Sequence, residues 1–371
     1  MIVGVPKEVK NSENRVSTTP AGVAEYVGRG HEVVVETRAG TGSGFADAEY
    51  ERAGARIAPT AGDVYAAADM IVKVKEPVAE EYDLLRRGQL LFTYLHLAAD
   101  EPLTRSLMAN GVQAVAYETV QLPNRALPLL TPMSEVAGRM SVQVGAYYLQ
   151  ATNGGGGRLL GGVPGVPPSN VVVVGGGVVG TNAAQIALGM GANVTIVDNN
   201  VERLRQLDLL LHGRLHTLAS NRDNLAEAVR DADLVIGSVL LPGAKAPKLV
   251  TEAMVRSMRP GSVVVDVAID QGGCIATSKP TSHTDPVFEL GGVVHYCVTN
   301  MPGAVPRTST LALANVTLPY ALELAGKGLV EAARADAALA KGINVLDGRV
   351  TYSAVAEAFG IEYTPLPDLI G

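Results

Sequence analysis

Residues 171–180 read VVVVGGGVVG, and this run carries the clearest structural signal in the chain. Four consecutive valines predict a buried β-strand, and the small apolar residues after position 180 predict a helix. Between them Gly175, Gly177 and Gly180 form the pattern Gly-x-Gly-x-x-Gly. In such a unit the first glycine permits a tight turn, the second lets the backbone approach a pyrophosphate, and the third lets helix and strand pack closely. The run therefore predicts a Rossmann dinucleotide-binding domain.

A second predicted strand follows at residues 194–197 and ends in Asp198, 18 residues after Gly180. An acidic residue at this place accepts hydrogen bonds from the adenosine ribose and repels a 2′-phosphate, so it predicts NAD as the cofactor. Arg203 lies close by and leaves NADP as an alternative. The other alternative is a glycine-rich strand–helix turn that binds nothing. The combination of strand, glycine pattern, helix and acidic residue in this order argues against it.

The composition is that of a globular protein long enough for two or three domains. The chain has 371 residues, of which 47% are hydrophobic and 18% charged, and this excludes a disordered protein. A net charge of −7 and only 4% aromatic residues disfavour nucleic acid and anionic membranes as partners. The N-terminus lacks a signal-peptide pattern, and the two cysteines, Cys274 and Cys297, form neither a disulfide framework nor a metal motif. We expect a cytoplasmic protein without a metal ion.

Short apolar runs alternate with helical patterns along the whole chain, which predicts parallel sheets covered by helices on both faces. The predicted strands are residues 2–5, 33–35, 70–74, 90–94, 113–116, 171–174, 193–197, 234–236 and 262–265. Thr19 and Asp47 are predicted N-caps of two helices, and further helices are predicted from near residue 134 and near Thr308, the last with a kink at Pro319. Glycines 154–157 read as a flexible connector. The tail from residue 326 reads as helical.

We expect two doubly wound α/β domains separated by a cleft. Residues 1–133 and 306–371 form the predicted substrate domain, and residues 134–305 the predicted NAD-binding domain.

Four polar residues stand where an open α/β sheet binds its ligands, beyond the carboxyl ends of strands. Lys75, His96 and Asp270 each follow a predicted strand, and Arg15 lies in the loop after the first strand. Arg and Lys suit a small carboxylate, and His suits proton transfer at neutral pH. Taken singly, each residue has a plain alternative, namely a solvated charge, a packed histidine or a turn carboxylate. Their shared chemistry favours an active site for a small anionic substrate.

Several ordered blocks resemble the alanine dehydrogenase/proton-translocating transhydrogenase α-subunit family over essentially the whole chain. They are GVPKE (4–8), NRV (14–16), TP (19–20), KVKEP (73–77), PMSEVAG (132–138), GGVPGV (161–166), PGAKAP (242–247) and DQGGC (270–274).

This resemblance implies roles for individual residues. His96 and Asp270 match the catalytic pair, and Arg15 and Lys75 match the residues that hold pyruvate. The implied NAD contacts are Ser134, Gly175, Gly177, Val178, Gly180, Asp198, Arg203, Ser220, Val239, Leu240, Val267, Ala268, Ile269, Asp270, Lys279, Asn300 and Met301.

The resemblance also implies the reaction and the assembly. The expected activity is reversible oxidative deamination of L-alanine by NAD to pyruvate and ammonia, with glyoxylate as a further substrate. The expected assembly is a homohexamer of two-domain subunits whose cleft closes over the ligands. Two alternatives stay open: the NAD-binding subunit of a transhydrogenase, and a non-catalytic NAD-binding sensor.

Overall fold

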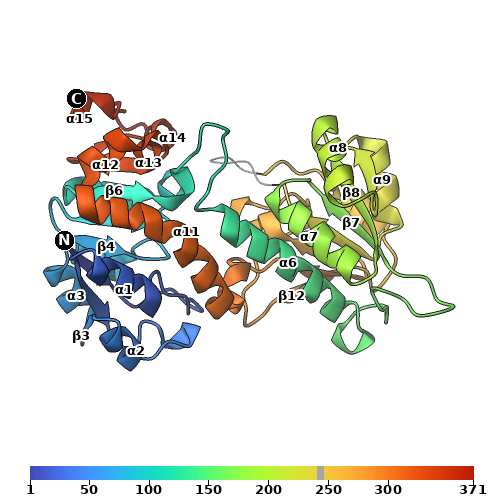
Figure 1. Ribbon diagram of the computed structural model, residues 1–371. Helices are drawn as coiled ribbons and strands as arrows, with labels where there is room; N and C mark the ends of the chain where they lie inside the picture. The colour runs from blue at the N-terminus through green and yellow to red at the C-terminus, as the bar shows by residue number, and fades with distance from the viewer. Residues whose placement is uncertain (240–245) are drawn as a thin grey trace. The chain divides into compact units, whose positions relative to one another are not determined.

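A computed structural model describes residues 1–239 and 246–371, and these form two compact units (Figure 1). Unit 1 contains Met1–Met133 and Val305–Gly371, and unit 2 contains Ser134–Ala304. The structure thus places residue 305 in unit 1, whereas the sequence assigned it to the second domain. Each unit has its own sheet covered by helices, so the expected fold of two doubly wound α/β domains is confirmed.

The sheet of unit 1 has the order β15-β14-β6-β5-β4-β1-β2-β3. Its strands are β1 (Ile2–Val5), β2 (Glu32–Glu36), β3 (Arg56–Ala58), β4 (Met70–Val72), β5 (Leu90–Thr93), β6 (Gln113–Ala116), β14 (Ile343–Leu346) and β15 (Arg349–Val350). The first six run parallel, and β14 pairs antiparallel with β6. The chain leaves β1 for β2 on one side and returns to β4 on the other. Such a switch point opens a ligand-binding crevice at the carboxyl ends of the strands.

The helices of unit 1 follow local signals in the sequence. They are α1 (Pro20–Gly28), α2 (Asp47–Arg52), α3 (Ala61–Ala67), α4 (Ala79–Tyr82), α5 (Glu101–Ala109), α11 (Pro306–Lys327), α12 (Leu329–Ala335), α13 (Ala337–Gly342), α14 (Ser353–Phe359) and α15 (Pro367–Ile370). Thr19 caps α1 as expected, because its hydroxyl accepts from the Gly22 amide at 3.1 Å. Asp47 is the first helical residue of α2 rather than its cap. Its carboxylate instead accepts from the Thr37 hydroxyl and the Arg38 amide.

The sheet of unit 2 has the order β12-β13-β11-β10-β7-β8-β9 and is parallel except for β12. Its strands are β7 (Asn170–Val174), β8 (Asn193–Asp198), β9 (His216–Ala219), β10 (Leu234–Gly237), β11 (Val263–Asp266), β12 (Val287–Leu290) and β13 (Val293–Tyr296). Its helices are α7 (Val178–Gly189), α8 (Val201–Leu210), α9 (Arg222–Arg230) and α10 (Glu252–Arg256), together with most of α6 (Thr131–Tyr148). The order reverses at β7, which again places a ligand crevice at the strand ends.

The structure corrects several local predictions. Strand β4 ends at Val72 and β5 at Thr93, each earlier than expected. The helical tail also contains β14 and β15, which the sequence pattern missed. Glycines 154–157 are not a loose connector, because the amides of Gly155 and Gly157 donate to the carbonyls of Gln150 and Leu149. Pro319 lies inside α11, which continues to Lys327.

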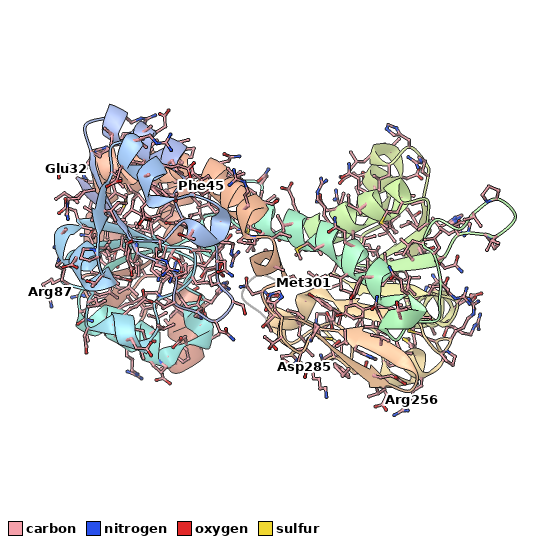
Figure 2. The ribbon with its side chains drawn as sticks, turned by 90° about the horizontal axis from the view of Figure 1, so that it is seen from below. Glu32, Phe45, Arg87, Arg256, Asp285 and Met301 are labelled. Atoms are coloured by element: carbon pink, nitrogen blue, oxygen red, sulfur yellow. The ribbon has the colours of Figure 1, made fainter. Side chains whose placement is uncertain are left out.

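Charged side chains are exposed on the surfaces of both units. Glu32 and Arg87 are exposed on unit 1, and Arg256 and Asp285 on unit 2 (Figure 2). Among the described helices, none has both the length and the apolar character needed to cross a bilayer.

Candidate functional site

In unit 1, four neighbouring strands carry polar residues at their carboxyl ends. Arg15 lies in the loop after β1, Lys75 follows β4, and His96 follows β5. Glu118, which the sequence reasoning did not single out, follows β6 in the short 3₁₀ helix Tyr117–Thr119. Because β6, β5, β4 and β1 are adjacent and parallel, these residues gather at one edge of the sheet.

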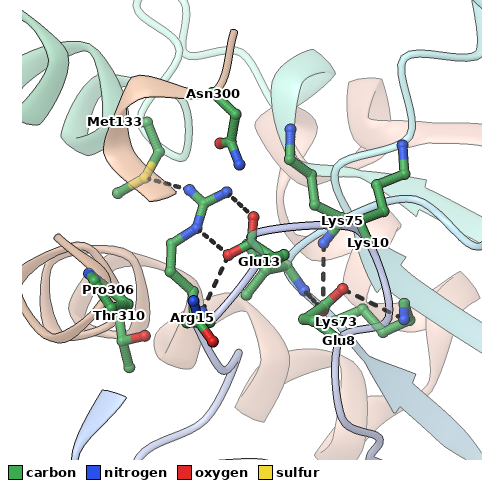
Figure 3. Close-up of polar contacts among 12 residues, drawn as sticks. Glu8, Lys10, Glu13, Arg15, Lys73, Lys75, Met133, Asn300, Pro306 and Thr310 are labelled. Carbon is green, nitrogen blue, oxygen red and sulfur yellow. Dashed lines mark hydrogen bonds and ion pairs between the residues drawn. The ribbon is translucent and has the colours of Figure 1, made fainter. Parts of the chain in front are cut away.

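Arg15 is buried, with 2% of its surface exposed, so the plain reading of a surface arginine is wrong. Its Nε and Nη2 atoms donate to the two carboxylate oxygens of Glu13 at 2.7 and 2.5 Å (Figure 3). Its Nη1 lies 3.1 Å from the sulfur of Met133. Burial lowers the pKa of the guanidinium, but the bond and the charge of Glu13 outweigh burial and raise it overall. Arg15 is therefore a fixed and permanently charged cation.

The two lysines of the segment 73–77 lie in different environments. Lys73 is buried, and its ammonium forms ion pairs with Glu8 at 3.4 Å and Glu81 at 2.6 Å. Lys75 is half-buried and forms no salt bridge to any carboxylate of the described residues. Its positive charge nevertheless lowers the pKa of the neighbouring Glu76, against the effect of burial. Lys75 rather than Lys73 thus has a charge available for an anionic ligand.

His96 has a left-handed backbone, with φ of 49°, which is uncommon outside glycine and often marks a functional position. Glu118 holds this conformation, since its Oε1 accepts from the His96 amide at 2.6 Å and lies 3.9 Å from Nδ1 of the ring. The ring stacks on Tyr94 with centroids 5.9 Å apart and planes 6° apart. Its side chain is 47% exposed. The strand end therefore presents a half-exposed imidazole with one face supported.

Tyr94 links this histidine to Arg15. Burial raises the pKa of its hydroxyl, while the charge of Arg15 lowers it to a smaller degree. The hydroxyl stays protonated and donates to the carbonyl of Leu129 at 2.6 Å. The ring of Tyr94 is thereby fixed beneath His96.

In unit 2 the glycine loop between β7 and α7 has the geometry of a phosphate cradle. Gly175 has φ of 102°, and a Cβ at Gly180 would lie 1.9 Å from the carbonyl oxygen of Gly175. A Cβ at Gly177 would meet no atom within 4 Å. Gly177 is also the N-cap of α7, whose first amides carry partial positive charge. The open space at Gly177 fits a dinucleotide pyrophosphate, which a side chain here would displace.

Asp198 and Arg203 meet the same loop from β8 and α8. The Oδ2 of Asp198 accepts from the Gly176 amide at 2.6 Å. The guanidinium of Arg203 donates to the Gly176 carbonyl at 2.7 Å and to the Thr181 hydroxyl at 2.8 Å. The structure therefore brings together the acidic and basic residues that the sequence placed at the adenosine ribose.

Two further predicted NAD contacts lie at the neighbouring strand ends. The amide of Ser220, just after β9, donates to the carbonyl of Asp198 at 2.9 Å. Val239, just after β10, lies against the glycine loop, since its Cγ2 would be 2.8 Å from a Cβ at Gly175.

Asp270 lies after β11 in the 3₁₀ helix Val267–Gln271. Ala268 and Ile269 are buried, whereas Asp270 is exposed, and its Oδ1 accepts from the Asn300 amide at 3.2 Å. Beneath this helix Asp266 is fully buried and accepts from the amides of Ala268, Cys274 and Ile275. Burial raises its pKa, and the Ser278 hydroxyl and the amides of Ile275 and Cys274 oppose that rise. Asp266 thus fixes the backbone that presents Asp270.

For the other predicted NAD contacts named below, no described contact joins the residue to the glycine loop. Lys279 lies over the ring of Phe288, 4.4 Å from its centroid. Ser134 is half-buried on α6, and Met301 is buried at the start of the 3₁₀ helix Met301–Ala304. Leu240 and the first part of the block at 242–247 lie outside the described residues.

Sequence reasoning missed the carboxylates that hold these side chains in place, namely Glu8, Glu13, Glu118 and Asp266. Each stands within a few residues of a strand end or of a predicted site residue, and that position was the one available signal.

Comparison with known proteins gives matches over nearly the full length of the chain. Residues 4–137 match the family model "Alanine dehydrogenase/PNT, N-terminal domain" and residues 141–353 match "Alanine dehydrogenase/PNT, C-terminal domain". An alanine dehydrogenase from Methanococcus maripaludis is 59% identical, with 98% of each chain covered. A solved L-alanine dehydrogenase is 57% identical with a TM-score of 0.94, covering 97% of this chain and 99% of that one. A transhydrogenase from Sinorhizobium meliloti is 30% identical with a TM-score of 0.82, covering 95% of this chain and all of that one.

Proposed function

Because this chain belongs to the alanine dehydrogenase/PNT family, we propose that it catalyses the reversible oxidative deamination of L-alanine by NAD. In the forward direction L-alanine, NAD⁺ and water give pyruvate, ammonium, NADH and a proton. Three curated relatives named alanine dehydrogenase are 58–59% identical over essentially the full chain, which supports the assignment.

One observation carries the substrate class. Unit 1 places a fixed arginine, a lysine with no salt bridge among the described residues and a half-exposed histidine at one sheet edge. Arg15 offers a rigid guanidinium and Lys75 a point charge, which together suit a small 2-keto or 2-amino carboxylate. The imidazole of His96 suits proton transfer at neutral pH.

Each of the four site residues has a separate role in the proposed reaction. Arg15 binds the substrate carboxylate and Lys75 polarises the carbonyl oxygen of pyruvate. His96 takes a proton from the substrate in one direction and returns it in the other, a role typically worth about 10²–10⁴ in rate. Asp270 orients the water that attacks the imine of the substrate, or the ammonia in reverse. NAD, when bound, supplies the hydride acceptor.

Unit 2 supplies the nucleotide specificity. The N-terminus of α7 binds the pyrophosphate, for which the open space at Gly177 leaves room. Asp198 accepts hydrogen bonds from the ribose. Asp198 disfavours a 2′-phosphate by charge repulsion, so we expect NAD to be preferred over NADP.

A direct assay distinguishes this proposal from the two alternatives. The purified chain is expected to reduce NAD when L-alanine is added and to oxidise NADH when pyruvate and ammonium are added. A transhydrogenase subunit would instead bind NADH and show no alanine-dependent turnover. A sensor would bind NADH, but its NADH complex would not bind pyruvate. Calorimetric titration of the NADH complex with pyruvate measures this.

We propose in addition that the chain is a cytoplasmic homohexamer and accepts glyoxylate. Family resemblance supports the assembly, which light scattering on the purified protein tests. Glyoxylate lacks only the methyl group of pyruvate, a difference worth about 1–3 kcal/mol in an apolar pocket. A survey of NADH oxidation with small keto acids tests the substrate range.

A further inference from the structure

Side chains hold the backbone amide and carbonyl of Lys75, just beyond the end of β4, while the preceding carbonyl of Val74 accepts from the Tyr94 amide at 3.4 Å. Strand β4 ends at Val72, although Lys73 and Val74 belong to the segment predicted as a strand and are both buried. The amide of Val74 donates to Oε1 of Glu8 at 2.6 Å, and the amide of Lys75 donates to the same oxygen at 3.3 Å. On the other side, the hydroxyl of Thr93 donates to the carbonyl of Lys75 at 3.1 Å. Both polar groups of the Lys75 backbone therefore have side-chain partners.

Glu8 is itself anchored. It is buried in the loop after β1, and its second oxygen faces the ammonium of Lys73 at 3.4 Å (Figure 3). Lys73 is held in turn by Glu81 at 2.6 Å, and Glu81 also accepts from the hydroxyl of Tyr65 at 3.0 Å. Hydrogen bonds therefore hold one oxygen of Glu8 and an ion pair with a buried ammonium attracts the other, which restricts the rotamer of this carboxylate.

We propose that Glu8 and Thr93 are positioning residues that fix the backbone of Lys75 and thereby aim its ammonium at the substrate. Glu8 touches no substrate and acts through Lys75. The inference rests on the proposed function for the role of Lys75 in substrate binding and for the identity of the ligand, pyruvate.

A purely structural role for Glu8 makes a different prediction. If Glu8 served only to neutralise Lys73, then Glu81 would be its equivalent, since both carboxylates pair with that ammonium. Glu81 makes no described hydrogen bond to the backbone of residues 73–75. Besides the Lys73 ammonium, it accepts from the Tyr65 hydroxyl and the Val78 amide. Glu81→Gln is therefore the matched control.

The first measurement is steady-state kinetics of pyruvate amination. Glu8→Ala is expected to raise the KM for pyruvate at least tenfold, with the Kd for NADH changed less than twofold. Glu8→Gln keeps an oxygen acceptor for the Val74 amide, so its KM is expected to stay within threefold of wild type. Thr93→Val removes the bond to the Lys75 carbonyl at nearly constant volume and is expected to raise the KM about threefold or more. Glu81→Gln is expected to change thermal stability but leave the KM within twofold.

Two results would overturn the proposal. One is a pyruvate KM within twofold of wild type in Thr93→Val and in folded Glu8→Ala. The other is a rise in Glu81→Gln as large as that in Glu8→Ala. Should Glu8→Ala not fold, Thr93→Val decides alone.

Hydrogen–deuterium exchange separates this inference from the proposed function. The amides of residues 74 and 75 are expected to exchange at least tenfold faster in Glu8→Ala than in Glu81→Gln. Equal exchange in these variants contradicts the positioning role whatever the enzyme turns over. Absence of alanine activity in the wild-type chain would contradict the proposed function. In that case the exchange measurement still tests the role of Glu8.

Discussion

Replacing Gly177 by alanine adds one methyl group, which is expected to weaken cofactor binding without disturbing the fold. A Cβ at this position meets no heavy atom within 4 Å, and φ is −69°, an ordinary value for alanine. The folded chain can therefore accept the methyl group. We expect the free energy of unfolding to change by less than about 1 kcal/mol, because a lost glycine N-cap and a stiffer unfolded chain act in opposite directions.

The same methyl group fills the space where the pyrophosphate approaches the N-terminus of α7. Losing one hydrogen bond between a backbone amide and a charged phosphate costs about 1.5–3 kcal/mol. That corresponds to a rise of about tenfold to about 100-fold in the Kd for NADH, since 1.4 kcal/mol is about tenfold.

The assay is NADH fluorescence titration together with thermal unfolding of the free protein. Gly189→Ala is the matched control, because this residue closes the same helix and its Cβ also meets no atom within 4 Å. The control is expected to keep wild-type NADH affinity. Gly180→Ala is expected to lose stability as well as affinity, because its Cβ would lie 1.9 Å from a carbonyl oxygen. Wild-type NADH affinity in Gly177→Ala would refute the assignment of this loop as the phosphate cradle.

The remaining predictions concern three other residues. His96→Ala is expected to lower alanine oxidation by about 10²–10⁴ in kcat with an unchanged Kd for NADH; substantial remaining turnover would contradict its role in proton transfer. Asp198→Gly is expected to shift the ratio of kcat/KM for NAD and NADP towards NADP, and an unchanged ratio would count against the ribose contact. Burial raises the pKa of Asp266, so its contribution to stability is greatest at low pH and falls as pH rises through that raised pKa. Urea unfolding between pH 4 and 8 is therefore expected to show the advantage of wild type over Asp266→Asn shrinking as pH rises, whereas a growing advantage would contradict the direction of this shift.

Local sequence patterns were sufficient to predict the strand–loop–helix unit around Gly175 and the positions of Lys75, His96 and Asp270 after strands. These features depend on neighbours within a few residues, such as the N-cap of α1 at Thr19. The prediction for Asp47 shows the limit of such rules. Its carboxylate bonds to Thr37 and Arg38 across a turn instead of capping its own helix.

Contacts between distant residues explain what the sequence did not predict. Strand β14 has only four residues and gains its pairing from β6, more than 200 positions earlier. Likewise Glu8 reaches the amide of Val74 across 66 positions, and Glu118 reaches that of His96 across 22. A carboxylate's partner at such separation depends on strand order, which no local pattern encodes. The supporting carboxylates therefore emerged only from the folded structure.

The central claim is that hydride passes from the Cα of L-alanine to NAD on this chain. Incubating the purified protein with NAD and L-alanine deuterated at Cα tests it directly, with the reduced nucleotide analysed by mass spectrometry and NMR. We expect one deuterium per reduced nicotinamide, located at C4, and an equal amount of pyruvate. Reduced nucleotide without deuterium, or no reduction while NADH binding is intact, would contradict the claim.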